Sequence, residues 1–274
     1  MNSSEKVCLK DLRVRLKDKE YVPLMVGGMG VNISTAEMVL AVEKLGGIAH
    51  LSDAMVMDLC DRLYGTSYSA DKAKRYYGCQ KNPDKSNNHF DLNALREATL
   101  RYVGDVMSRA TGRGLVFINC MEKLTFNAPH ESMAVRLNAA LDAGIDGITL
   151  SAGLHLMSFK LMSENKRFRE ACLGIVVSSV RALNLFLRKN KSLNRLPDYI
   201  VVEGPLAGGH LGFGEDWREY SLETIVKEVK AYLAENHLDI PVFAAGGIFT
   251  GGDAVRMIKE VGADGVQVAT RFTI

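Results

Sequence analysis

The residues best suited to chemistry lie in one glycine-rich stretch, residues 203–214, which read EGPLAGGHLGFG. It follows Tyr199–Val202, a short apolar run that predicts a buried strand. Gly208 and Gly209 lack a Cβ, so their backbone can lie close to a flat or anionic ligand. His210 comes next, and histidine is the side chain that exchanges protons near neutral pH. The stretch predicts a ligand site with a proton-transfer group, although a glycine turn beside an idle histidine would look the same.

The composition limits the class of protein. The 274 residues are 47% hydrophobic and 24% charged, as in a globular protein with a sizeable core. A net charge of +2 gives no electrostatic case for nucleic acid or a membrane surface. The N-terminal segment lacks the apolar core of a secretory signal, and no apolar run reaches the roughly 18 residues of a membrane helix.

The cysteines and histidines do not form a metal motif. The five cysteines are scattered without a C-x-x-C pair, and no H-E-x-x-H occurs. This pattern is typical of reduced thiols in the cytosol and gives no support for a zinc site. We therefore expect a cytoplasmic protein without a structural metal.

The elements that must position the glycine loop alternate regularly along the chain. Apolar, β-branched runs predict eight strands, and each run from the third onward is separated from the next by one helix. The expected strands are Tyr21–Val26, Ile48–Leu51, Gly114–Ile118, Gly147–Leu150, Leu173–Val177, Tyr199–Val202, Ile240–Ala245 and Asp264–Val268. The expected helices are Ala36–Leu45, Leu92–Ala110, His130–Ala143, His155–Ala171, Val180–Lys189, Leu222–Glu235 and Asp253–Val261.

This alternation of strands and helices predicts an α/β fold, a closed (β/α)8 TIM barrel, as one domain over residues 1–274. The strands are apolar throughout, as in parallel sheets that are covered on both faces. A doubly wound open sheet is the competitor, but no G-x-G-x-x-G follows any of the strands. The sequence ends at Ile274, directly after the eighth strand, so an eighth helix is not expected within it.

An insertion over residues 53–90 follows the second strand and departs from the repeat. We expect it to be irregular, with acidic residues early and a basic, tyrosine-rich cluster from Lys72 to Lys85. The ends of parallel barrel strands share one face, so this stretch leaves the barrel on the face that carries His210. A flap over the site and a solvated or subunit-contacting insertion are both consistent with it.

The ends of the last two strands suggest an anion site. Barrels bind phosphate groups after strands seven and eight, where this chain has Gly246-Gly247 and Ala269-Thr270. The glycines can expose backbone N–H groups, and Thr270 adds a hydroxyl. A tight turn that needs glycine only for its shape is the alternative reading.

Five motifs in this order resemble the nitronate monooxygenase (2-nitropropane dioxygenase) family of FMN-dependent barrels. Its superfamily includes flavin-type enoyl-ACP reductases and NADH:quinone reductases, so the motifs specify the superfamily better than the reaction. The motifs are Met25–Val31, Phe117–Cys120, Glu203–His210, Ala244–Ile248 and Val266–Phe272.

The resemblance implies FMN across the barrel mouth and His210 as the catalytic histidine. Relatives usually have glycine at the position of Ala269, and many have a lysine where this chain has Val176 and Val177. Ser178 is offered as a hydroxyl substitute for that lysine. The residues implied to bind the cofactor are Gly27, Gly28, Met29, Asn119, Met121, Ser178, Gly208, Gly209, Gly246, Gly247, Gln267, Ala269 and Thr270.

The implied reaction is oxidation of an alkyl nitronate by oxygen to a carbonyl compound and nitrite. The partners would be a small anionic substrate and oxygen, without nucleic acid or membrane, and a homo-oligomer is left open. An FMN-dependent NAD(P)H reductase acting on a quinone or an enoyl thioester is the second hypothesis. A barrel that binds a phosphate ligand without redox chemistry is the third.

Overall fold

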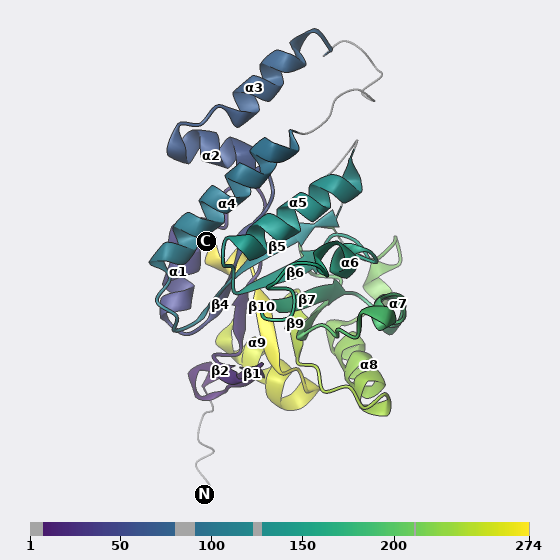
Figure 1. The fold of residues 1–274 in the computed structure, drawn as a ribbon. Coiled ribbons are helices and arrows are strands. Elements are labelled where there is room, and N and C mark those ends of the chain that lie inside the picture. The colour runs from purple at the N-terminus through teal and green to yellow at the C-terminus, as the bar shows by residue number, and fades with distance from the viewer. Residues whose placement is uncertain (1–7, 80–90, 123–127, 211, 274) are drawn as a thin grey trace, which may run out of the picture.

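Eight parallel strands close into a barrel, which confirms the fold expected from the sequence (Figure 1). The computed structural model describes residues 8–79, 91–122, 128–210 and 212–273. The strand order around the barrel is β10-β3-β4-β5-β6-β7-β8-β9. The strands are β3 (Leu24–Val26), β4 (Ile48–Ser52), β5 (Leu115–Met121), β6 (Gly147–Ser151), β7 (Cys172–Val177), β8 (Tyr199–Glu203), β9 (Val242–Ala245) and β10 (Gly265–Val268).

Helices cover the outside of the barrel, and side-chain caps fix where several of them begin. The Thr35 hydroxyl accepts from the Met38 N–H, and the Ser179 and Ser221 hydroxyls cap their helices in the same way. None of the described helices could cross a membrane. They are α1 (Ala36–Lys44), α2 (Val56–Tyr64), α3 (Tyr68–Arg75), α4 (Leu92–Arg109), α5 (Pro129–Asp142), α6 (Ser158–Met162), α7 (Val180–Asn190), α8 (Leu222–Glu235) and α9 (Gly251–Arg256).

Large aromatic rings fill the barrel interior, and each lies against a glycine of a neighbouring strand. The Phe117 and Tyr199 rings are stacked with centroids 5.4 Å apart, and Phe243 meets Tyr199 edge-on at 6.0 Å. A Cβ on the facing glycine would collide with each ring. The pairs are Phe117 with Gly147, Tyr199 with Gly174, and Phe243 with Gly265.

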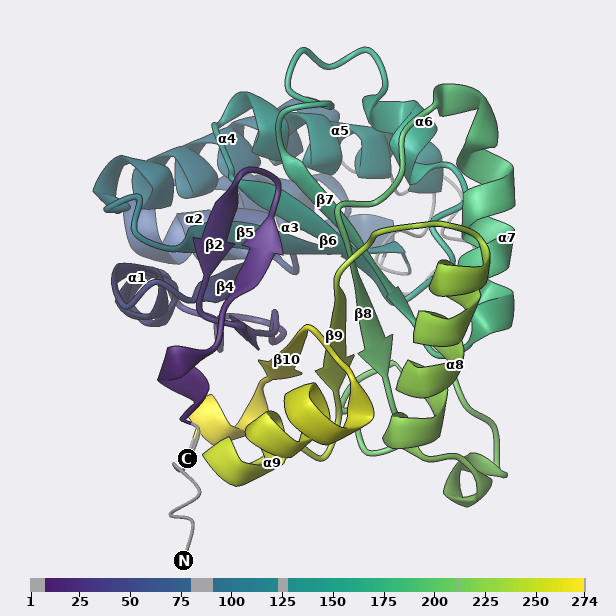
Figure 2. The ribbon, with the colours of Figure 1, turned by 90° about the horizontal axis from the view of Figure 1, so that it is seen from below.

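A short antiparallel hairpin closes the lower end of the barrel, as Figure 2 shows. It consists of β1 (Val14–Leu16) and β2 (Lys19–Tyr21), and the sequence reasoning did not foresee it. Val14, Leu16 and Tyr21 are buried in the same cluster as the aromatic rings of the interior. Tyr21 therefore belongs to the hairpin, and the first barrel strand begins later than expected.

The insertion after β4 is helical, contrary to the irregular stretch we expected. The α2 helix buries Val56, Met57, Leu59 and Cys60, and both α2 and α3 lie beside α4 at the top of Figure 1. Asp61 organises the turn between them, because its carboxylate accepts hydrogen bonds from the Tyr68 and Ser69 N–H groups. Burial acts to raise the pKa of Asp61, but a hydrogen bond from the Thr66 hydroxyl, together with these backbone hydrogen bonds, holds the pKa below its usual value.

The helix expected over residues 155–171 is also wrong, because α6 has only five residues. After α6, Asn165 turns the chain: its side chain accepts from the Arg167 N–H at 2.9 Å and donates to Asp142 at 2.9 Å. Asparagine side chains that bond to nearby backbone compete with helix formation in this way. The apolar content of this segment predicted a helix, but the hydrogen bonds of the Asn165 side chain turn the chain after α6.

Candidate functional site

The loop after β3 forms one side of the barrel mouth. The Gly27 N–H donates to the last carbonyl of β10 at 2.8 Å, and the Met29 N–H donates to the Ser34 hydroxyl at 2.8 Å. A Cβ at Gly28 would collide with Asn119, so glycine is required where these two residues meet. Gly28 and Asn119, which the sequence assigned to one site, lie side by side.

A buried ion pair between Asp53 and Arg136 holds the upper ends of β4 and β5. The side chains of Asp53 and Arg136 are only 2% and 4% exposed. The Asp53 N–H donates to the Asn119 carbonyl at 3.2 Å, and Arg136 Nη2 donates to the Met121 carbonyl at 3.1 Å. The pair therefore fixes the backbone that carries Asn119 and Met121. The sequence reasoning had counted Asp53 among the acids of the insertion and had given Arg136 no role.

The glycine loop after β8 is anchored at both ends and open in its middle. The Gly204 N–H donates to the last carbonyl of β9 at 2.9 Å, and Gly212 lies directly against the Ser178 side chain. Apart from their chain neighbours, no described residue lies within 4 Å of the Cβ positions of Gly208 and Gly209. His210 is exposed, and no hydrogen bond joins its ring to another described residue. The loop therefore presents bare backbone and a free imidazole.

The turn after β9 consists of two glycines and lies against the histidine loop. Gly246 and Gly247 have φ angles of +107° and +73°, which side chains other than glycine rarely adopt. A Cβ on Gly246 would lie 2.7 Å from the Ala207 nitrogen, so this turn packs against the histidine loop. Among the described residues, the N–H groups of Gly247 and Ile248 find no acceptor. Two backbone donors are thus available to a ligand.

The chain after β10 lies beside this turn. The Arg271 guanidinium lies over the Phe249 ring at 4.8 Å from the ring centroid, which joins the two loops. Thr270 is exposed at the start of a short 3₁₀ turn, and its N–H is not used within that turn. Ala269 has a φ of −135° and a ψ of −74°. The alanine that stands where relatives usually have glycine therefore does not require the positive φ that favours glycine.

A chain of hydrogen bonds crosses the barrel interior beneath the mouth. His50 Nδ1 lies 2.7 Å from the Val26 carbonyl, and its Nε2 lies 2.5 Å from the Thr149 hydroxyl, which lies 2.5 Å from the Tyr199 hydroxyl. A carbonyl only accepts, so Nδ1 carries the proton and Nε2 accepts from Thr149. Burial lowers the pKa of His50 to about 4, so the ring is neutral. His50 was not among the residues expected from the sequence, although its hydrogen bond to Val26 supports the strand that precedes Gly27.

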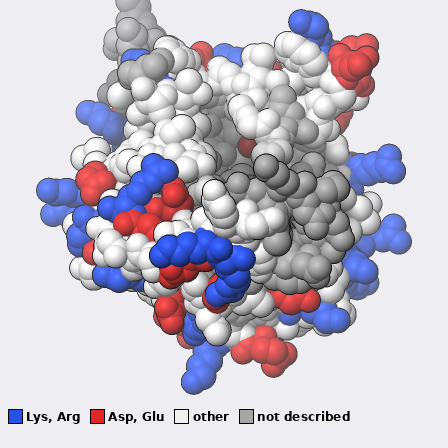
Figure 3. Space-filling model, turned by 90° about the horizontal axis from the view of Figure 1, so that it is seen from above, with Lys and Arg blue, Asp and Glu red and all other residues white. Residues whose placement is uncertain are grey.

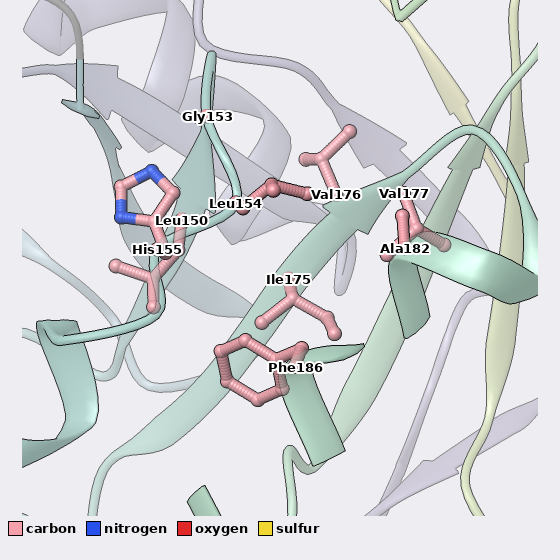
Figure 4. Close-up of a pocket in the computed structure, with 9 residues that line it drawn as sticks. All are labelled: Leu150, Gly153, Leu154, His155, Ile175, Val176, Val177, Ala182 and Phe186. Atoms are coloured by element: carbon pink, nitrogen blue, oxygen red, sulfur yellow. The ribbon is translucent and has the colours of Figure 1, made fainter. Parts of the chain in front are cut away.

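A small, mostly apolar pocket opens between the ends of β6 and β7 and the start of α7 (Figure 4). Val176 and Val177 line it, at the positions where relatives place a lysine. His155 turns its ring toward the Ser151 carbonyl at 2.5 Å and the Ser158 hydroxyl at 2.8 Å. Burial lowers its pKa. None of the described residues that line the pocket supplies a cation in place of the missing lysine.

Seen from above, Lys and Arg side chains lie next to Asp and Glu side chains, so both signs of charge are mixed on this face (Figure 3). The basic residues of α3 are partly neutralised, since Arg75 pairs with Asp91 at 3.4 Å and Lys74 with Asp71 at 4.0 Å. The rest of the expected basic cluster, including Lys81 and Lys85, lies outside the described residues. A flap role for the insertion stays a prediction.

The family model for nitronate monooxygenase matches residues 119–274, which is more than half of the chain. The chain belongs to the nitronate monooxygenase family. Members of this family are FMN-dependent oxidoreductases, and the protein is an enzyme of that type. The match begins in β5 and includes the histidine loop and both expected phosphate turns. No curated protein matches the chain.

Solved structures support the fold of this family member. The chain is similar to an IMP dehydrogenase/GMP reductase-like protein from Corynebacterium glutamicum, at 16% identity and a TM-score of 0.57, with 98% of this chain and 70% of that chain covered. A weaker likeness, to a candidate deoxyribose-phosphate aldolase from Coccidioides immitis, has 16% identity and a TM-score of 0.41 over 62% of this chain and 66% of that chain. Only the first likeness has a TM-score high enough to carry an argument, and at 16% identity that argument concerns the fold alone.

Proposed function

We propose that the barrel binds FMN across its mouth, with the phosphate on the turn after β9. The unpaired N–H groups of Gly247 and Ile248 and the exposed Thr270 are donors that suit a phosphate. The open backbone of Gly208 and Gly209 leaves room for a flat ring beside the histidine loop. These features fit the group, and Gly27, Met29, Asn119, Met121, Ser178, Gln267 and Ala269 would complete its surroundings.

The reaction we propose is oxidation of an alkyl nitronate by oxygen to a carbonyl compound and nitrite. Bound FMN would supply the electron-transfer chemistry, and the protein supplies position and electrostatics. His210 would take a proton from a neutral nitroalkane, or when protonated would stabilise the oxygens of a nitronate. Its exposed ring, without a hydrogen bond to another described residue, is available for either role.

The observation that carries this function is the contact between the turn at Gly246 and the loop that bears His210. Because Gly246 packs against the Ala207 nitrogen, an anion on the turn and a proton acceptor on the loop share one side of the mouth. A cofactor phosphate and a reacting substrate need this arrangement. Family membership supplies the redox class.

The test combines cofactor identification with substitution of His210. Heat-released cofactor should chromatograph as FMN, and His210→Ala should keep the cofactor but lose roughly 10²–10⁴-fold in turnover of a neutral nitroalkane. The loss should be smaller on preformed propane-2-nitronate, which has already lost its proton. His237→Asn is the matched control, because His237 is exposed after the C-terminal end of α8. FAD, or no flavin after reconstitution, would contradict the proposal.

A reductase using NAD(P)H on an uncharged quinone or enoyl thioester is the second candidate. The apolar pocket beside Val176 favours it, because the described residues that line this pocket offer no cation to an anionic substrate. Rapid anaerobic bleaching of the flavin by NADH or NADPH would support the reductase. Turnover with propane-2-nitronate but no bleaching would support the oxidase.

A further inference from the structure

Each barrel strand has a last residue that faces inward, and among the described strands one of these residues is ionisable. Residues that share a face with the interior aromatics point into the barrel, because side chains alternate along a strand. On seven of the eight strands the last inward-facing residue is uncharged, and on β8 it is Glu203. In chain order these residues are Met25, Ser52, Met121, Ser151, Val176, Glu203, Ala245 and Gln267.

The inward direction of Glu203 follows from its register. Tyr199 and Val201, four and two residues earlier on β8, both belong to the interior cluster. Glu203 pairs in register with Ala245 of β9, which is also part of that cluster. On the other side of β8, Val176 packs against the same cluster. The carboxyl group therefore enters the mouth between two apolar neighbours.

No described residue neutralises this carboxyl group. Neither a hydrogen bond nor an ion pair joins the Glu203 side chain to another described residue, and burial alone raises its pKa to about 7. Neighbouring β7 and β9 present no charged residue inward near it, and His210 is the one further titratable group described on the same glycine loop. The charged residues of α8, which packs behind β8 on the outside of the barrel, are Glu223, Lys227, Glu228, Lys230 and Glu235.

We propose that Glu203 determines the charge of the ligand that the mouth accepts. When protonated, its O–H donates a hydrogen bond to a ligand oxygen. When ionised, it has no partner among the described residues and repels an anion in a medium that screens charge poorly. Above neutral pH the site would therefore take the neutral nitroalkane in preference to the nitronate. This inference rests on the proposed function and names the substrate form that its site binds.

Nitrate tests this inference, because it is planar like a nitro group and stays anionic at every working pH. Its dissociation constant on the FMN-loaded protein can be measured from the change in flavin absorbance between pH 5.5 and 9. If only the protonated carboxyl group permits binding, affinity falls about tenfold per pH unit above the pKa of Glu203. Glu203→Gln should remove this loss, and Glu219→Gln, at an exposed acid of the same loop region, should retain it.

The experiment also separates Glu203 from His210, whose deprotonation would weaken anion binding in the same direction. In a His210→Asn background the loss of affinity with pH should persist, and adding Glu203→Gln should abolish it. Equal pH profiles for the protein with and without Glu203→Gln would overturn the inference. If Glu203→Gln does not fold, a dissociation constant for nitrate that stays the same from pH 5.5 to 9 in the unmodified protein would also overturn the inference. Failure to bind FMN would overturn the proposed function and this inference with it, whereas normal FMN binding with a flat profile would overturn the inference alone.

Discussion

Replacing Glu203 by glutamine should stabilise the flavin-free protein at alkaline pH and leave its stability unchanged in acid. The pKa of this carboxyl group rises from an ordinary 4.5 to about 7 on folding, because folding buries it. Between these values the folded protein holds a proton that the unfolded chain has released. The stability of the unmodified protein therefore falls as the pH rises from about 4.5 to 7 and then stays level. Glutamine does not titrate and avoids this loss.

The magnitude follows from the difference in pKa. A difference of about 2.5 pH units, at about 1.36 kcal/mol each, gives an upper value of about 3.4 kcal/mol. Glu203 is half-buried rather than fully enclosed, so water screens part of the cost. We expect Glu203→Gln to raise the free energy of unfolding by roughly 2 kcal/mol at pH 8 and by about 0 at pH 4.

Urea unfolding followed by circular dichroism at pH 4, 5, 6, 7 and 8 measures this difference directly. Glu219→Gln serves as the matched control, since Glu219 is exposed and its replacement should give no pH-dependent gain. A gain from Glu203→Gln that is the same at every pH would show that packing, not ionisation, separates the two proteins. A loss of stability at pH 8 would refute the reasoning altogether.

Two further substitutions test the supports of the mouth. Gly247→Asp should weaken FMN binding far more than folding, because its carboxylate would lie beside the phosphate and its side chain would strain a residue at φ +73°. Titration with FMN measures the loss of affinity, and the urea midpoint measures the loss of stability. An unchanged affinity for FMN would place the phosphate elsewhere. Arg136→Met should cost about 3–5 kcal/mol in the free energy of unfolding, because it leaves the buried Asp53 carboxylate unpaired. Adding Asp53→Leu should recover much of that loss, and a double variant no more stable than Arg136→Met would argue against the ion pair as the cause.

The barrel itself was predictable because its signals are local. Parallel strands covered on both faces are continuous apolar runs, and the predicted strands match the observed ones to within a few residues. The helices expected to begin at Val180 and Leu222 do begin there, directly after the capping hydroxyls of Ser179 and Ser221. The elements that sequence reasoning missed depend on distant partners. The β1–β2 hairpin carries charged residues, and only contact with the barrel floor buries its Val14, Leu16 and Tyr21.

Neighbours at the mouth are easier to anticipate where glycine marks them than where charge supports them. Gly28 lies against Asn119, and the turn at Gly246 packs against the histidine loop, so residues that the resemblance grouped together lie near one another. The Asp53–Arg136 pair joins residues 83 positions apart, and one sequence does not show such a pairing. Glu203 could have been found, because strand alternation from Tyr199 places it on the inward face.

Inside the barrel, each large aromatic ring lies against a glycine of a neighbouring strand. This pairing restricts how the sequence can evolve. A methyl group on Gly174 would collide with the Tyr199 ring, so that glycine can change only after the ring has become smaller. A smaller residue at position 199 alone would instead leave a void and remove the hydroxyl that bonds to Thr149. The two positions are therefore epistatic: each single change is harmful, and together their effects are not additive. Homologous barrels should consequently exchange such pairs jointly or keep both, while the loops at the mouth vary one residue at a time.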